Sequence, residues 1–256
     1  MTADGDLDAA RARLEDLLSR NPENRALNIV RLRVVLSQGD VEAIENQYRR
    51  LIEILPEETQ LRAALAEFYI GQGEPLKAEE ELRSIAEISA DDPEAALDVV
   101  RFVYQRSGAD AARTELETRI AETEDASFAL PLKFALADLE RLEGRTDAAR
   151  NVLVSAIDAA DDESVADRAR IQLARLELSE GGEEQARALV DAVLERDPEN
   201  VDGLSLRARM QIDEDRPAEA ILTLRRALDL APQNVEVLLL EADAQSRNGN
   251  TVLAGE

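Results

Sequence analysis

The chain has 256 residues, a formal net charge of −25 at pH 7, and neither cysteine nor histidine. This composition excludes disulfides, thiol chemistry and zinc sites built from Cys and His, and it removes the commonest general base of enzymes. The acidity disfavours binding to phosphate backbones and anionic lipid surfaces, so nucleic acid is not an expected partner. Aromatic residues make up only 3% of the chain, and the abundance of Ala, Leu, Glu and Arg predicts an all-α protein.

No apolar run approaches the roughly 18 residues that a membrane-spanning helix needs. Residues 1–10 also lack the charged start and apolar core of a signal peptide. We therefore expect no direct membrane insertion in this segment. The compartment stays open between the cytoplasm and the periplasm, because the absence of cysteine is compatible with either redox state.

Turn residues recur along the chain at a nearly constant spacing of 34 to 37 residues. The markers are Gly5, Gly39, Gly73, Gly108, Gly144, Gly181, Asp215 and Gly249. Asp215 stands where the period requires a seventh glycine. A fixed period of this length indicates a structural unit that buries its apolar face by stacking on copies of itself.

Two helices are predicted per period. In chain order we place them at residues 6–20, 24–38, 40–55, 57–72, 74–89, 92–107, 109–123, 126–143, 145–159, 162–180, 182–196, 199–214, 216–230 and 233–248. Five prolines (Pro22, Pro56, Pro93, Pro198 and Pro232) fall between units, and we place Pro75, Pro131 and Pro217 in first helical turns, where a missing N–H costs little. Asn21 and Asp197 are predicted N-caps.

A small residue follows most markers at a distance of five residues. This set comprises Ala10, Ala78, Ala149, Ala186, Ala220 and Ala254, with Ile44 and Ala112 as the variants. Large apolar residues then continue at helical spacing, as in Ala220, Leu224, Ala227 and Leu228, which form the stripe of an amphipathic helix. The small residue predicts a close approach between two helices.

This pattern resembles the tetratricopeptide repeat, with its 34-residue period, small residues at helix contacts and closing proline. Residues 199–232 match best, although the chain has no Trp and lacks the Leu-Gly pair of the first helix; Tyr48 and Tyr69 occupy the aromatic positions. The resemblance implies a right-handed α-solenoid of stacked antiparallel helix pairs over residues 1–256. We expect about six full repeats and a half repeat at each end, as in a fragment of a longer bacterial protein.

In this family the first helix of each pair lines a concave groove that receives a peptide or helix. Carried over to the matching helices, the groove-facing set includes Arg33, Phe102, Arg106, Phe134, Arg141, Arg175, Arg209 and Arg247. Arg141, Arg175 and Arg209 are 34 residues apart, so we expect them to stack as a ladder that binds an acidic peptide or a C-terminal carboxylate. Ordinary surface decoration is the alternative, because Asp213 and Asp110 follow Arg209 and Arg106 by four residues.

Several apolar residues are also candidates for the groove. Apolar residues at helical spacing usually belong to the core and do not contact a partner, so we expect most of these candidates to be core residues. They are Ile29, Leu36, Ile171, Leu178, Ile212 and Leu239, together with Phe102 and Phe134. The two phenylalanines are the exceptions, because large aromatic residues are scarce in this chain and serve well as interface anchors.

Acidic runs at residues 77–82, 160–164 and 180–184 raise the possibility of metal or acid–base chemistry. None of them has the order of oxygen ligands and glycine that a calcium loop needs, and the chain has no phosphate-binding loop or nucleophile elbow. We interpret the runs as solvated helix faces and helix N-terminal charges. No metal, cofactor or catalytic residue is expected.

The sequence favours a non-catalytic scaffold or adaptor that binds a partner protein or peptide. An alternative is the binding arm of an envelope-associated assembly or export factor, which rests on the family resemblance alone. An enzyme with a carboxylate-based site is the third possibility, and a deep pocket with carboxylates of raised pKa would favour it.

Overall fold

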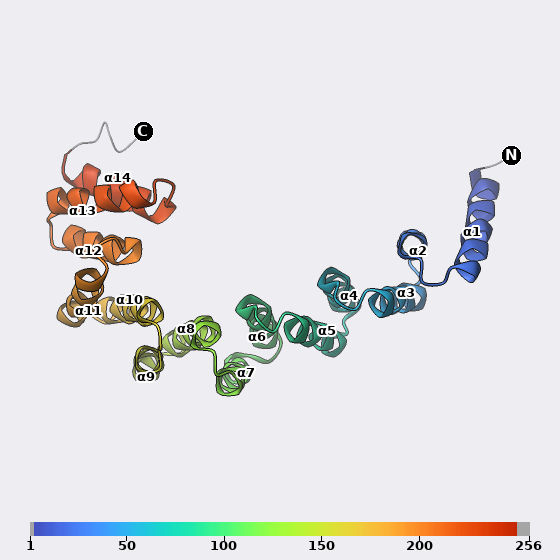
Figure 1. Cartoon of the computed structure of the whole chain (residues 1–256), viewed down its shortest axis with the longest axis horizontal. Helices are drawn as coiled ribbons and strands as arrows, with labels where there is room; N and C mark the ends of the chain where they lie inside the picture. Colours follow the sequence, from blue (N-terminus) through green and yellow to red (C-terminus); the bar gives the residue numbers. More distant parts are fainter. Residues whose placement is uncertain (1–2, 250–256) are drawn as a thin grey trace. The chain divides into compact units, whose positions relative to one another are not determined.

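The structure is a computed structural model that describes the backbone of residues 3–249 and the side chains of residues 9 and 11–249. Over this range it consists of fourteen helices and contains no strand (Figure 1). They are α1 (Ala3–Arg20), α2 (Arg25–Gln38), α3 (Val41–Ile54), α4 (Thr59–Gln72), α5 (Pro75–Ile88), α6 (Pro93–Ser107), α7 (Ala109–Glu122), α8 (Ala126–Leu142), α9 (Thr146–Asp158), α10 (Glu163–Ser179), α11 (Glu183–Arg196), α12 (Val201–Asp213), α13 (Pro217–Leu230) and α14 (Val235–Arg247). The predicted all-α fold is confirmed.

The chain divides into two compact units, residues 1–115 and 116–256. Within each unit, helices that are consecutive in the chain pack on each other, most extensively in the pairs α4–α5, α8–α9, α10–α11 and α12–α13. In the second unit α10 also packs on α8, and α12 on α10 and α14. Stacked helix pairs are the architecture of an α-solenoid. The single solenoid of about six repeats stays a prediction.

At several predicted turn markers the backbone adopts the left-handed region. Gly39, Gly73, Gly144 and Gly181 have φ between 72° and 80°, and Asp215 has a φ of 59°. Asp215 is the sole non-glycine residue with positive φ in the described part of the chain. The prediction of Gly5 as a turn residue is wrong, because Gly5 lies inside α1, which begins at Ala3.

Replacing Asp215 with glycine should stabilise the protein. Left-handed backbone costs an L-residue about 1–2 kcal/mol, and Asp tolerates it better than most residues, so the expected gain in unfolding free energy is about 0.5–1 kcal/mol. Urea unfolding followed by circular dichroism measures it. The reciprocal change, Gly144→Ala at a φ of 74°, should destabilise by a similar amount, and a loss of stability in Asp215→Gly would contradict the prediction.

The helix starts differ from the prediction in two respects. The N-caps are Asn24 and Asn200, three residues after the predicted Asn21 and Asp197, and their side chains accept hydrogen bonds from amides in the first turns of α2 and α12. The intervening Pro-Glu dipeptide forms the turn, so the cap follows it. Pro131 is inside α8 and not in its first turn, because Asp125 caps that helix six residues earlier.

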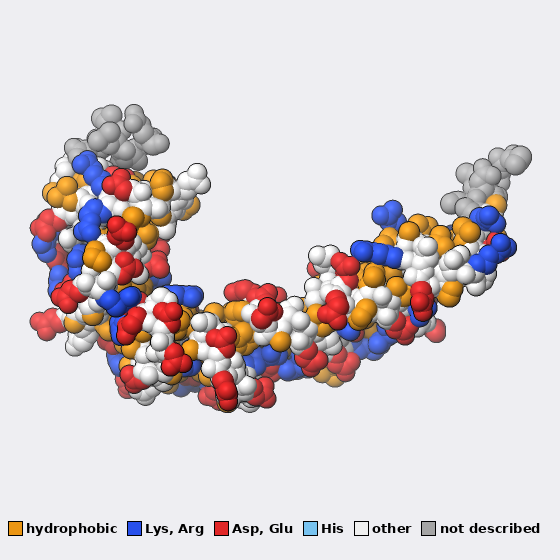
Figure 2. All heavy atoms as spheres, viewed as in Figure 1, with side chains coloured by type: hydrophobic (Ala, Val, Ile, Leu, Met, Phe, Trp, Pro, Cys, Tyr) orange, Lys and Arg blue, Asp and Glu red, His pale blue; other side chains and the backbone are white. Residues whose placement is uncertain are grey.

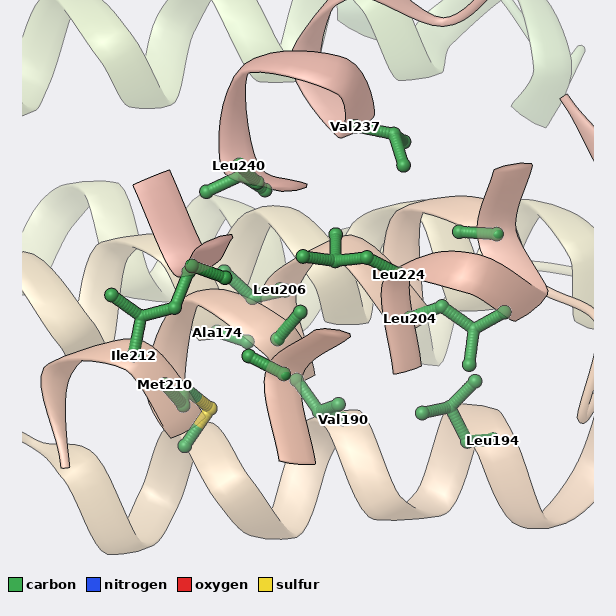
Figure 3. Packing of buried hydrophobic residues seen from close by; sticks show 14 of the residues in the cluster. Ala174, Val190, Leu194, Leu204, Leu206, Met210, Ile212, Leu224, Val237 and Leu240 are labelled. Carbon is green, nitrogen blue, oxygen red and sulfur yellow. The ribbon is translucent and has the colours of Figure 1, made fainter. Parts of the chain in front are cut away.

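Small residues lie at the helix contacts, as predicted. Ala78, Ala149, Ala186 and Ala220 are fully buried, and Ala112 and Ile44 are nearly so. Ala10 and Ala254 lie outside the described side chains. In the second unit, α10 to α14 contribute to one apolar cluster, with Leu204, Leu224 and Val237 among its buried members (Figure 3). Side chains from five helices thus fill one core.

A second cluster in the first unit joins α2 to α5 and includes Val35, Leu65 and Tyr69. None of the described helices has both the length and the apolar character that crossing a bilayer requires.

Candidate functional site

Arg141, Arg175 and Arg209 line two neighbouring cavities of the second unit. The first, of about 250 Å³, lies between α8 and α10 and includes Phe134, Arg141 and Arg175. The second, of about 480 Å³, lies along α10, α12 and α14 and includes Arg175, Arg209 and Glu236. Arg175 lines both cavities, so the three predicted arginines do come together on one surface. We call Arg141, Arg175 and Arg209 the arginine surface.

The three arginines do not occupy equivalent helical positions. Arg175 and Arg209 precede their turn residues Gly181 and Asp215 by six residues, whereas Arg141 precedes Gly144 by three. The repeat between Gly144 and Gly181 is 37 residues long, so a spacing of 34 does not connect equivalent positions there. Arg141 therefore lies about one helical turn nearer the end of its helix, and the strict ladder consists of Arg175 and Arg209.

Among the residues that the structure describes, the guanidinium groups of the arginine surface form no hydrogen bonds. Arg141 is 3.7 Å from Asp138, and Arg175 is 3.9 Å from Asp202 and 3.7 Å from Glu236. Arg209 is 3.8 Å from Glu236, and no ion pair joins it to Asp213. Such separations are too long for hydrogen bonds. The donor groups of three partly exposed arginines are therefore available to another molecule.

Two arginines on α9 and α11 of the second unit behave differently. Arg150 on α9 donates from Nε to Glu177 on α10 at 2.6 Å, and the Glu177 side chain is only 11% exposed. This hydrogen bond raises the pKa of Arg150. Arg187 on α11 pairs in the same way with Glu214, and both pairs span 27 residues. These arginines join neighbouring repeats, because their donors are engaged by acids on the next helix pair.

The other predicted arginines have separate environments. Arg106 is 2.7 Å from Glu79 on α5, whereas the sequence suggests Asp110 as its partner. Arg247 donates to Asp243 at 3.1 Å, which raises the pKa of Arg247. Arg33 is exposed on α2 in the first unit. None of these three lines the cavities of the arginine surface.

The two phenylalanines also differ. Phe134 is partly buried against the core of α8, α9 and α10 and lines the first cavity beside Arg141. Phe102 packs against the apolar cluster of the first unit. Among the other apolar candidates, Ile171 and Ile212 are buried, whereas Leu239 is 67% exposed.

The run at 77–82 is not a solvated face, which corrects the sequence interpretation. The Glu81 side chain is 10% exposed and 2.8 Å from Arg62 on α4, and the Glu79 side chain is 12% exposed and pairs with Arg83 and Arg106. The run at 160–164 does contain a helix N-terminal charge. Asp162 caps α10, and its hydrogen bond with Ser164 lowers the pKa of Asp162. Within the described residues, no three acids gather as a metal site would require.

Sequence reasoning missed Glu236, the acid between Arg175 and Arg209. A signal for it exists, because Asp202 precedes Glu236 by 34 residues and both lie in the first turn of their helices. Asp202 also faces Arg175. An acid recurring at the repeat period opposite recurring arginines could have indicated the pair.

Comparison with protein families gives two matching models, both described as tetratricopeptide repeat. One matches residues 35–101, and the other matches residues 3–59 and 171–235. The chain belongs to the tetratricopeptide repeat family. Members of this family are generally non-catalytic protein–protein interaction modules that bind protein or peptide partners. No curated protein matches the chain significantly.

The fold is shared with a solved tetratricopeptide repeat protein, and other solved structures are similar at lower scores. A tetratricopeptide repeat protein from Parabacteroides merdae is 17% identical with a TM-score of 0.52, and the match covers 94% of this chain and 93% of that one. PilF of Pseudomonas aeruginosa is 19% identical with a TM-score of 0.44, covering 88% and 99%. YrrB, described as having an unusual peptide-binding site, is 18% identical with a TM-score of 0.42, covering 75% and 95%.

Proposed function

We propose that this protein is a non-catalytic interaction scaffold whose second unit binds an acidic peptide segment, or a C-terminal carboxylate, on the arginine surface. The observation that supports it is a set of three guanidinium groups that lie beside two cavities and form no hydrogen bond with any described residue. A carboxylate would accept two parallel hydrogen bonds from one guanidinium, which makes Arg well suited to this ligand.

The proposed surface lies on the first helices of successive pairs. Phe134 and Arg141 belong to α8, Arg175 to α10 and Arg209 to α12. This placement agrees with the concave groove that the family uses for peptides. Phe134 adds an apolar contact beside the arginines, so the proposed surface offers both a charged and an apolar anchor to one extended segment.

The negative charge of the whole protein opposes an acidic ligand. Figure 2 shows acidic side chains spread over the visible surface of both units. At physiological ionic strength the Debye length is about 8 Å, so exposed acids farther away than this are largely screened. The short-range field at the cavities then depends on the arginines and on their nearest acids.

A direct test uses a labelled peptide of twelve glutamates and its twelve-glutamine analogue, with binding measured by fluorescence anisotropy. The wild type should bind the glutamate peptide more tightly. The double variant Arg175→Ala, Arg209→Ala should weaken this binding about tenfold or more, because charged hydrogen bonds contribute about 1.5–3 kcal/mol each.

The matched control removes two positive charges from the same unit outside the cavities. Arg225 and Arg226 are exposed on α13, and Arg225→Ala, Arg226→Ala should leave the affinity within about twofold. Equal losses in both double variants, or equal binding of the two peptides by the wild type, would overturn the proposal.

A further inference from the structure

Glu236 occupies the position between the two arginines of the strict ladder. Its Oε2 is 3.7 Å from Arg175 Nη2 and its Oε1 is 3.8 Å from Arg209 Nη2. The three side chains are 36% to 51% exposed, and all three line the larger cavity. One carboxylate thus faces two guanidinium groups from a wall of the cavity and contacts neither within hydrogen-bond distance.

This arrangement differs from the ion pairs that stabilise the fold. Glu177 and Glu115 are mostly buried and accept hydrogen bonds at 2.6 to 2.8 Å from Arg150 and Arg83. Exposed pairs with longer separations contribute little to stability. A structural role therefore explains the position of Glu236 poorly. Its carboxylate instead adds a negative charge to the wall of the cavity, beside the two arginines.

The backbone holds Glu236 at this place. Asn234 caps α14 by accepting a hydrogen bond from the amide of Val237, and Glu236 lies in the first turn that this cap fixes. An acid near a helix N-terminus is also favoured by the helix dipole. The cap therefore fixes the backbone from which the Glu236 side chain reaches the arginines.

We infer that Glu236 is a built-in competitor that lowers the affinity of the arginine surface for carboxylate ligands. The inference rests on the proposed function. A ligand carboxylate that binds Arg175 and Arg209 must lie next to the carboxylate of Glu236. The two negative charges then repel each other. Glu236 thereby restricts binding to ligands whose several contacts outweigh this repulsion, and it discriminates against single free carboxylates.

The test is the isosteric variant Glu236→Gln with the same glutamate and glutamine peptides. We expect it to bind the glutamate peptide about fivefold more tightly or better than the wild type, with unchanged binding of the glutamine peptide. A purely structural role cannot produce this result, because damage to the fold lowers affinity. A thermal unfolding curve checks that the fold is kept.

The control is Asp243→Asn on the same helix, which changes the net charge by the same amount. Asp243 pairs with Arg247 at 3.1 Å and does not line the cavity, so its variant should change the affinity by less than about twofold. Equal gains in both variants, or no gain or a loss in Glu236→Gln, would overturn the inference. A wild type that does not distinguish the two peptides would overturn the proposed function as well.

Discussion

Replacing Leu224 with alanine should lower the free energy of unfolding of the second unit by about 2–5 kcal/mol. Leu224 on α13 is fully buried, and it lies in the cluster that joins α10 to α14 (Figure 3). The loss combines the transfer of the leucine side chain with the cavity left among rigidly packed neighbours. Urea unfolding followed by circular dichroism measures the change, and amide hydrogen exchange assigns it to these helices.

Leu222→Ala is the matched control for Leu224→Ala. Leu222 is on the same helix, two residues earlier, and is 63% exposed. Its replacement should change stability by no more than about 0.5 kcal/mol. Similar losses at the two positions would contradict the packing described for α13.

Replacing Ala220 with leucine should destabilise the second unit by about 1–3 kcal/mol through overpacking. Ala220 is fully buried in the same cluster, at the position where a small residue recurs along the chain. A leucine there must displace a neighbouring helix or adopt a strained rotamer. The measurement is the same unfolding experiment, and phenylalanine at this position should be at least as unfavourable.

Ala218→Leu provides the comparison for Ala220→Leu, because Ala218 is exposed on the same helix. Its expected effect is within about 0.5 kcal/mol. A neutral effect of Ala220→Leu would show that the side chain at residue 220 does not set the separation of the helices.

Most of the fold was predictable because each element repeats a local pattern. Apart from Gly5, the period located turn residues, and it placed Asp215 at the position of a glycine, where the structure shows a φ of 59°. The caps at Asn24 and Asn200 were predicted three residues too early, because Asn and Asp residues flank both sides of the Pro-Glu turn. Local composition alone does not decide which of them accepts the hydrogen bond.

The site was less predictable, because it depends on distances between helices. The 34-residue spacing correctly predicted that Arg175 and Arg209 lie close together. It did not place Arg141 correctly, because the repeat between Gly144 and Gly181 has 37 residues. The burial of Glu79 and Glu81 depends on arginines from neighbouring helices, which a run of acids does not reveal. Arg175 and Arg209 likewise form no hydrogen bond with Glu236, because α14 places its carboxylate 3.7 and 3.8 Å from them.

The ion pairs between repeats have an evolutionary consequence. Arg150 pairs with Glu177 and Arg187 with Glu214, each 27 residues later, and Arg150 and Arg187 each directly follow a buried alanine, Ala149 and Ala186. A tandem duplication of residues 150–186 would therefore splice one helix onto an equivalent one. Arg150, its copy and Arg187 would each still have a glutamate 27 residues ahead, so the duplication would preserve these ion pairs between repeats.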